Sequence, residues 1–160
     1  MASREGGFGV ASEEDFKRLS GLELLRGIIE GRLPAPTISS TMGFRLVEVE
    51  PGVAVFEGEP GPHLLNPLGS VHGGVALTLI DSAAGCAVHS ELGAGIGYTT
   101  VETKVNFTRP IAPDGGKVRC EGRVVTRGRT IATAEARLLS AAGKILAHGT
   151  STLIILTPRG

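Results

Sequence analysis

The sequence predicts an α+β fold in which a curved antiparallel sheet wraps one long central helix. Apolar and polar residues alternate with the period of a β-strand in two regions, residues 44–59 and 98–156. Between them lies one apolar run, residues 75–88, which is long enough for a helix and rich in small residues. Strands gathered on both sides of a single helix are typical of an antiparallel sheet. A small-residue helix then fits the concave face of the curved sheet.

The first 36 residues are predicted to precede the main domain. Residues 1–11 are glycine-rich and expected to be disordered, and residues 12–36 form a helical extension. Ser12 is a suitable N-cap, acids follow it, and apolar residues recur at helical spacing from Phe16 to Ile29. Gly21 weakens or bends this segment, and Gly31 ends it. We expect the helix to cover the sheet or an edge of the core, and the main domain to span residues 37–157.

Six strands are predicted. The two before the central helix span residues 44–49 and 53–59, joined by the turn dipeptide Pro51-Gly52. The other four span residues 98–107, 117–126, 130–140 and 144–156, with glycine-containing turns at 114–116, 127–129 and 141–143. The order is therefore helix, two strands, long helix and four strands.

Composition narrows the class of protein. The 160 residues are enough for one domain with a sizeable core, and 16 basic residues balance 16 acidic ones, which gives no support for nucleic-acid binding. The cysteines Cys86 and Cys120 lack a paired spacing, so we expect reduced thiols and no metal site. Neither a signal peptide nor an apolar run of ~18 residues is present, so we expect a cytoplasmic protein that does not span a membrane.

The loop that leads into the central helix carries the first candidate for chemistry. It runs from Asn66 to His72, and Gly73 and Gly74 lie at its junction with the helix. The first N–H groups of a helix have no partner within it, and the helix dipole adds positive character there. This end of the helix is therefore suited to hold a developing oxyanion. Taken alone, the two glycines favour a simpler interpretation, in which they only permit a tight turn before a core helix, because a lone glycine pair is a weak motif.

The second candidate is Asp81, an acid in a helix that is apolar nearly all round. At helical spacing it shares a face with Gly74, Thr78 and Gly85. A carboxylate on such a face is costly unless it is paired or hydrogen-bonded, and its partly apolar setting suits a general base. The alternative is structural, because the carboxylate could cap a neighbouring backbone segment or fix a subunit interface.

The spacing of these two groups predicts a dimer. Gly73 and Asp81 are eight residues apart, which is about 12 Å along a helix axis, so one carbonyl group cannot reach both within one chain. If both act in one reaction, Asp81 must come from a second copy of the helix. A two-fold dimer with antiparallel helices would supply it and would form two equal sites.

The combined pattern resembles a known family. Asn66, five residues, His72-Gly73-Gly74, six residues and Asp81 are followed by a strand that carries Thr99-Thr100. This pattern is similar to that of the hotdog-fold acyl-CoA thioesterases of the phenylacetic acid degradation (PaaI-like) type, over residues 40–156. In that family a curved sheet wraps the helix and two subunits join their sheets edge to edge. The resemblance implies a homodimer, and we expect two dimers to form a homotetramer.

The resemblance also implies roles for individual residues. The Gly73 N–H would bind the thioester oxygen, and Asp81 of the opposite subunit would act as general base on water or as nucleophile. Asn66 and His72 would shape the loop and orient substrate or water, although His72 is equally compatible with a purely structural contact to the loop backbone. Thr100 stands where the family has a Ser or Thr near the acid, with Thr99 as the register alternative. The remaining candidates for binding substrate or CoA are Gly74, Arg109, Arg127 and Arg129.

These residues together favour a hydrolase. We expect an acyl-CoA thioesterase that acts on an aryl- or medium-chain acyl-CoA, with no cofactor, since coenzyme A is part of the substrate. One alternative is a non-catalytic acyl-CoA or acyl-carrier binding or sensor protein, which the costly acid Asp81 disfavours. Another is a hotdog-fold dehydratase, which would need a catalytic His paired with an acid on the helix. The other histidines, His63, His89 and His148, lack partners at ligand spacing and are expected to be structural.

Overall fold

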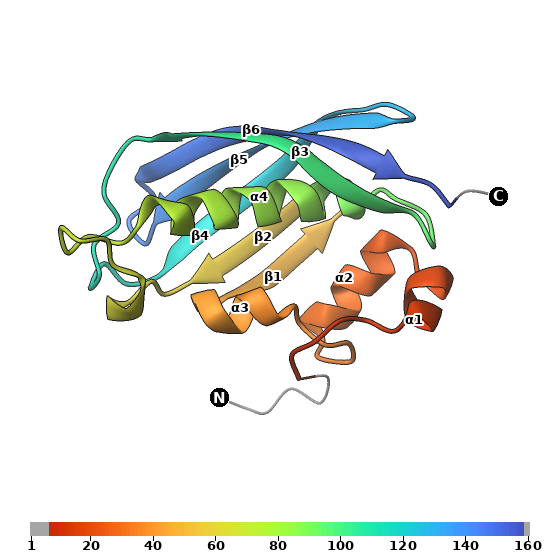
Figure 1. Ribbon diagram of the computed structural model, residues 1–160, viewed down its shortest axis with the longest axis horizontal. Helices are drawn as coiled ribbons and strands as arrows, with labels where there is room; N and C mark the ends of the chain where they lie inside the picture. The colour runs from red at the N-terminus through yellow and green to blue at the C-terminus, as the bar shows by residue number, and fades with distance from the viewer. Residues whose placement is uncertain (1–6, 159–160) are drawn as a thin grey trace.

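The structure, a computed structural model, describes residues 7–158 and confirms the predicted α+β fold. One antiparallel sheet of six strands, in the order β1-β2-β4-β5-β6-β3, curves around helix α4 (Figure 1). The helix spans Gly73–His89, as the glycine pair and the apolar run predict. The strands are β1 Phe44–Glu50, β2 Val53–Gly58, β3 Gly97–Phe107, β4 Val118–Arg127, β5 Ile131–Ser140 and β6 Ile145–Leu156.

The sheet is not assembled in sequence order. Strand β3 follows α4 in the chain but pairs with the last strand, β6, at the edge of the sheet. Strand β4 returns to pair with β2, so the hairpins β1-β2 and β4-β5 lie side by side. Alternation predicts each strand but not which strands are neighbours. The position of β3 at an edge is therefore information that only the structure provides.

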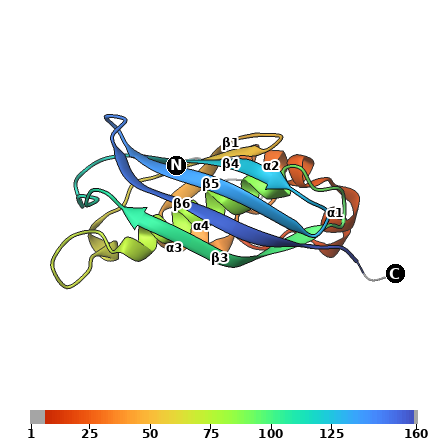
Figure 2. The ribbon, with the colours of Figure 1, turned by 90° about the horizontal axis from the view of Figure 1, so that it is seen from above.

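Helix α4 lies in the concave face of the sheet (Figure 2). Its buried side combines the large residues Leu79 and Ile80 with the small residues Ala83, Ala84 and Ala87, all of which are at most 1% exposed. The approach to β4 is so close that a Cβ at Gly122 would collide with the backbone of Ala83. The small residues of the helix and the glycine of the strand both allow this close approach, since larger side chains on either element would push α4 and β4 apart.

One side of α4 is less buried than the sequence predicts. The helix was expected to be covered all round, but Leu77 is 40% exposed, and Gly74, Thr78 and Asp81 are half-buried. The cause is geometric, because the curved sheet of one chain covers only the inner side of the helix. Asp81 therefore lies on the side that the sheet leaves open.

The predicted N-terminal helix is two helices, α1 Glu13–Arg18 and α2 Gly21–Ile29. Ser12 caps α1 as expected, since its hydroxyl accepts the Asp15 N–H at 3.0 Å. The break follows from a capping box, in which Ser20 accepts the Glu23 N–H and the Glu23 carboxylate accepts the Ser20 N–H. A Ser followed three residues later by Glu marks such a start, so the sequence did contain the signal. Helix α2 packs against β1 and meets the end of α4, where the Gly21 N–H donates to the Leu92 carbonyl.

A third short helix, α3, spans Thr37–Met42 and was not predicted. It ends at Gly43, whose φ of 71° is a left-handed conformation that suits glycine. Of the segment expected to be disordered, residues 1–6 lie outside the described residues. Gly7 and Gly9 are hydrogen-bonded to Ala35 through the backbone, so this part is held against the extension. The division into an extension and a main domain at residue 37 stays a prediction.

Candidate active site

The loop before α4 is held together by Asn66. Its side-chain oxygen accepts the Leu68 N–H at 2.9 Å and the Ser70 N–H at 3.2 Å, and its amide donates to the Ser70 hydroxyl at 2.9 Å. Gly69 adopts a φ of 81° within this turn, which suits glycine. The structure therefore gives Asn66 the loop-shaping part of its predicted role. The part toward substrate or water stays a prediction.

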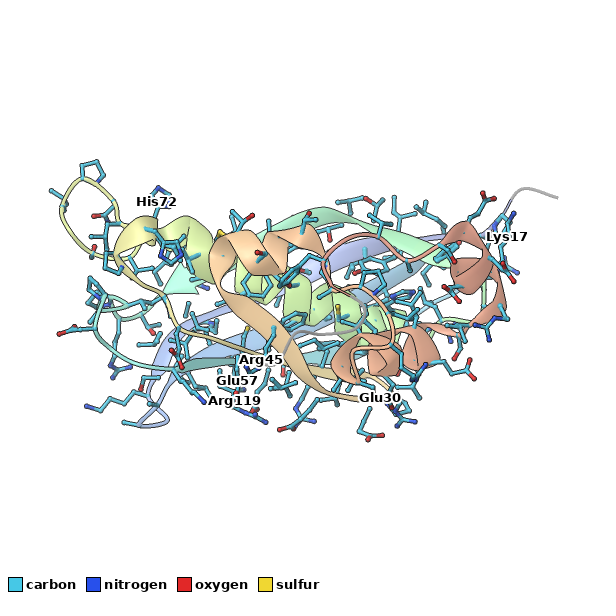
Figure 3. All side chains as sticks on the ribbon, turned by 90° about the horizontal axis from the view of Figure 1, so that it is seen from below. Lys17, Glu30, Arg45, Glu57, His72 and Arg119 are labelled. Atoms are coloured by element: carbon cyan, nitrogen blue, oxygen red, sulfur yellow. The ribbon has the colours of Figure 1, made fainter. Side chains whose placement is uncertain are left out.

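His72 is the N-cap of α4. Its Nδ1 accepts the Gly74 N–H at 2.8 Å, and its carbonyl accepts the Val75 N–H at 3.0 Å. Nδ1 therefore carries no proton in this arrangement, and a neutral ring holds its proton on Nε2. The ring is exposed at the loop end of the helix (Figure 3). The structural contact that sequence reasoning left open for His72 is thus present.

These contacts leave one N–H at the helix end available. Gly74 and Val75 donate to His72, whereas no carbonyl or side chain within residues 7–158 accepts the Gly73 N–H. The free donor lies at the positive end of a 17-residue helix, where negative charge is favoured. Among the first N–H groups of α4, that of Gly73 is therefore the candidate donor to an oxyanion, and this role stays a prediction.

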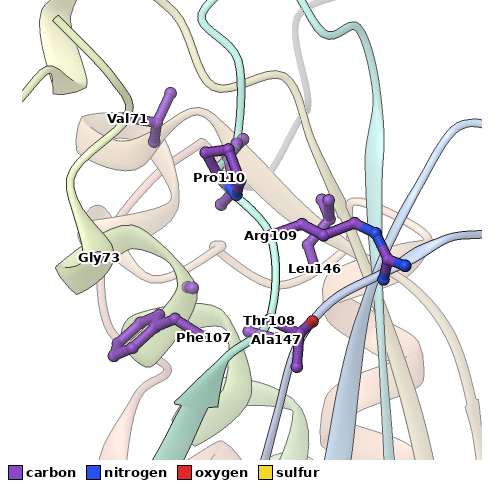
Figure 4. A pocket seen from close by; sticks show the side chains of 10 residues that line it. Val71, Gly73, Phe107, Thr108, Arg109, Pro110, Leu146 and Ala147 are labelled. Carbon is purple, nitrogen blue, oxygen red and sulfur yellow. The ribbon is translucent and has the colours of Figure 1, made fainter.

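A cavity of about 250 Å³ lies beside Gly73, between the start of α4 and the ends of β3 and β6 (Figure 4). Its lining is mostly apolar, and the ring of Phe107 stands close to Gly73. A Cβ added at Gly73 would lie 3.2 Å from Phe107 Cε1, which is tighter than ordinary contact. Arg109 lines the same cavity, and its guanidinium donates to the Ile145 carbonyl at 2.9 Å. The full lining is Val71, Gly73, Ala76, Phe107, Thr108, Arg109, Pro110, Ile111, Leu146 and Ala147.

Asp81 receives a hydrogen bond that sequence reasoning missed. The Thr103 hydroxyl on β3 donates to Asp81 Oδ1 at 3.1 Å and lies 2.7 Å from the Ser151 hydroxyl on β6. Within residues 7–158, neither Thr99 nor Thr100 makes a side-chain hydrogen bond to Asp81. In the same chain the hydroxyl beside the acid is therefore that of Thr103. The roles of Thr99 and Thr100 toward substrate or a partner's acid stay predictions.

Two further titratable groups lie near Asp81. Burial raises the pKa of the Cys86 thiol to about 12, and the negative charge of Asp81 adds to this effect. Burial also raises the pKa of Tyr98 well above its ordinary value, again with a contribution from Asp81. Both groups are therefore neutral at physiological pH. Both cysteines are free thiols, as expected.

The three candidate arginines do not lie together. Arg109 is at the cavity, whereas Arg127 and Arg129 belong to the exposed turn between β4 and β5. That turn lies at the other end of the sheet, since Arg127 is paired with Ala132 while the cavity lies where Phe107 pairs with Ala147. Within one chain, the two arginines of the turn cannot share a ligand with Arg109.

Residues 7–158 contain no group of three or more His, Cys, Asp or Glu side chains that could hold a metal ion. Over the same range, every helix is too short or too polar to cross a membrane.

Comparison with known proteins completes the description of the site. The sequence profile described as the thioesterase superfamily matches residues 68–147, which include Gly73, Asp81 and Thr103. Human acyl-coenzyme A thioesterase 13 is 29% identical over 132 residues, 80% of this chain and 91% of that protein. A candidate esterase from Halobacterium salinarum is 34% identical over 88 residues, 54% of this chain and 56% of that protein. A candidate thioesterase related to phenylacetic acid degradation from Ralstonia eutropha has a similar structure, with a TM-score of 0.74 and 26% identity over 82% of this chain and 98% of that chain.

Proposed function

Because the chain belongs to the thioesterase superfamily and is a thioester hydrolase of the hotdog fold, we propose that its substrate is an aryl- or medium-chain acyl-CoA. The products are the free acid and coenzyme A. The observation that supports this proposal is the Gly73 N–H at the start of α4, which has no acceptor within residues 7–158 and belongs to a residue that lines a largely apolar cavity. The names of the human and Ralstonia eutropha relatives support the acyl-CoA class and an aryl acid, respectively.

The chemistry needs a donor for the oxyanion and a base for water. As water adds to the thioester carbonyl, the carbonyl oxygen gains negative charge, which the Gly73 N–H and the dipole of α4 stabilise. The carboxylate of Asp81 from the second subunit removes the proton of the attacking water. Direct attack by that carboxylate on the carbonyl, followed by hydrolysis of the anhydride, is the second route. In the first route the C–S bond breaks as the tetrahedral intermediate collapses, and the proton that Asp81 took from water passes to the departing sulfur of coenzyme A. In the second route coenzyme A leaves as a thiolate when the anhydride forms, and the proton released when water hydrolyses the anhydride neutralises it.

The open edge of the sheet supports the dimer that this chemistry requires. Strand β3 is an edge strand, and its Val101 and Phe107 are 51% and 59% exposed. Leu77 on the uncovered side of α4 adds further exposed apolar surface. Antiparallel pairing of β3 with its own copy would continue the sheet and place the two α4 helices antiparallel. The Asp81 of one chain would then approach the Gly73 of the other.

The phosphates of coenzyme A need cations at the mouth of the cavity. Arg109 is already there, since it lines the cavity in the same chain. In an antiparallel dimer, the far end of the partner sheet comes to this side, so Arg127 and Arg129 would contribute from the second subunit. A homotetramer built from two dimers and a location in the cytoplasm complete the proposal.

The decisive experiment combines turnover with binding. A panel of aryl-, short-, medium- and long-chain acyl-CoA thioesters is followed by release of free thiol, with Asp81→Asn as the matched variant. We expect turnover to be highest for aryl or medium chains and to fall by ~10²-fold or more in Asp81→Asn, as for loss of a general base. Tight binding of acyl-CoA without turnover would instead identify a non-catalytic binding protein. An Asp81→Asn variant with half the wild-type activity would remove Asp81 from the mechanism.

A further inference from the structure

We propose that Thr103 and Ser151 are positioning residues for Asp81 and fix the orientation of its carboxylate through a chain of two hydroxyl groups. The inference rests on the proposed function, in which Asp81 is the base. Neither residue belongs to the pattern by which the sequence resembles the thioesterases. They come from different strands, β3 and β6, and meet below the helix that carries the acid.

The direction of the hydrogen bonds follows from the chemistry of the groups. An ionised carboxylate only accepts hydrogen bonds, so the Thr103 hydroxyl must donate its proton to Asp81 Oδ1. With its proton committed, Thr103 can only accept from Ser151, whose hydroxyl lies 2.7 Å away. The proton order is therefore Ser151 to Thr103 to Asp81. Each hydroxyl polarises the next, which strengthens the bond that reaches the carboxylate.

The surroundings of Ser151 hold these two hydroxyl groups in place. Ser151 is 1% exposed and is directly opposite Thr103 on β3 and Ala134 on β5. A hydroxyl in such a setting is costly unless it is hydrogen-bonded, and an alanine would pack there at no such cost. The side chain cannot turn to water, so its direction is fixed by the sheet. Within residues 7–158, no side chain bonds the second oxygen of Asp81, so Oδ2 is left for the reacting water.

A β-bulge is what brings Thr103 to the acid. Strand β3 pairs Thr100 with Leu153 and Glu102 with Thr152, so Val101 is the extra residue between them. With uninterrupted alternation, Glu102 would share the inner side with Thr100 and would lie opposite Ser151. The bulge reverses the alternation and puts Thr103 there instead. A carboxylate that would repel Asp81 is thereby exchanged for a hydroxyl that donates to it.

The test compares Thr103→Val and Ser151→Ala with a matched hydroxyl pair elsewhere in the sheet. We expect Thr103→Val to lower kcat about 10- to 100-fold, as for loss of a hydrogen bond to a charged group, with KM little changed. Ser151→Ala is expected to lower kcat less, about 3-fold, again with KM little changed. Thr103→Ser keeps the donor and retains most of the activity.

Thr133→Val is the control, because Thr126 and Thr133 form a second cross-strand hydroxyl pair at 2.8 Å, away from Asp81. It should leave both kcat and KM unchanged, whatever its effect on thermal stability. A folded Thr103→Val with wild-type kcat, alongside an inactive Asp81→Asn, would overturn the positioning role while the proposed function stands. If Thr103→Val does not fold, Ser151→Ala decides in the same way. An active Asp81→Asn would overturn the proposed function itself.

Discussion

The two edges of the sheet differ in what protects them. The β1 edge is charged and covered, since α2 packs against it, Arg26 of α2 contacts Glu50 at 3.0 Å, and Glu48 pairs with Arg119. The β3 edge carries the exposed charges of Glu102 and Lys104, but no helix within residues 7–158 packs along it, and its Val101 and Phe107 are more than half exposed. Charge and cover are the usual protection of an edge against pairing with another chain. The difference shows that β1 is the better protected edge, and β3 is the edge at which the proposed dimer would continue the sheet.

The largest expected effect is a loss of turnover, and it tests whether two chains that pair through β3 share an active site. Asp81→Asn and Gly73→Pro should each fold and lose ~10²-fold or more of kcat, since each removes one group of a shared site and proline is tolerated in a first helical turn. Co-expression with two different tags allows the mixed dimer to be purified. This dimer should recover about half the wild-type activity, because one of its two sites is intact.

The matched control for this experiment is a doubly tagged dimer of Asp81→Asn alone, which should remain inactive. A mixed dimer as inactive as its parents would show that Gly73 and Asp81 of opposite chains do not meet. An active monomer, seen by light scattering at the assay concentration, would contradict the dimer directly.

A second prediction compares the edges by placing one charge on each. Val101→Lys on β3 should weaken the dimer and lower activity about 10-fold at micromolar concentration, because a buried lysine opposes pairing of the edge. Glu48→Lys on β1 loses only an exposed ion pair and should leave both properties unchanged. Light scattering and activity over a dilution series check both. Equal effects at the two edges would remove the distinction between them.

A smaller effect is expected from the cavity next to the β3 edge. Gly73→Ala keeps the N–H, but its Cβ would stand 3.2 Å from Phe107 Cε1 and push the ring into the cavity. We expect KM to rise about 3- to 10-fold with kcat nearly preserved, the signature of impaired substrate binding. Adding Phe107→Leu to Gly73→Ala should lower KM part of the way back to the wild-type value. A loss confined to kcat would mean that the methyl group displaces the N–H instead.

The smallest effect concerns the covered side, where α2 meets the end of α4. Burial lowers the pKa of His89 below its ordinary value of 6.5. Above pH 6.5 the ring is neutral in both folded and unfolded chains, so His89 adds no pH dependence. Below it the unfolded chain binds the proton first, and stability falls until the folded pKa is reached. Between pH 7.5 and pH 5.5, the midpoint of thermal unfolding should therefore fall further for the wild type than for His89→Gln. Equal falls would refute a contribution of His89 to the pH dependence of stability.

Sequence reasoning reached the fold because its signals are local. The glycine pair and the small-residue run place α4 at Gly73–His89, and turn residues separate the strands near their observed ends. The split between α1 and α2 had a local signal too, the capping box of Ser20 and Glu23, but the apolar spacing that runs through it outweighed that signal.

The missing parts of the site depend on pairing between distant segments. Thr103 reaches Asp81 only because Val101 is bulged out, and a bulge is defined by the partner strand rather than by its own residues. The position of Ser151 also depends on strand pairing, since its strand, β6, lies between β3 and β5 in the sheet. The positions of the arginines also depend on strand pairing, because Arg109 and Arg127 look equivalent as residues at strand ends but lie at opposite ends of the sheet within one chain.

The pairing of β3 with the last strand has a consequence during protein synthesis. The ribosome makes β3 well before β6, and β6 is its neighbour in the sheet. Until residues 145–156 have emerged, both edges of β3 are unpaired in the nascent chain, which is a state prone to wrong association. Docking of β6 pairs one edge of β3 and brings Ser151 to Thr103. If the proposed dimer forms through the other edge, β3 becomes ready to pair with a second copy at the same step at which the hydrogen bonding of Asp81 is completed.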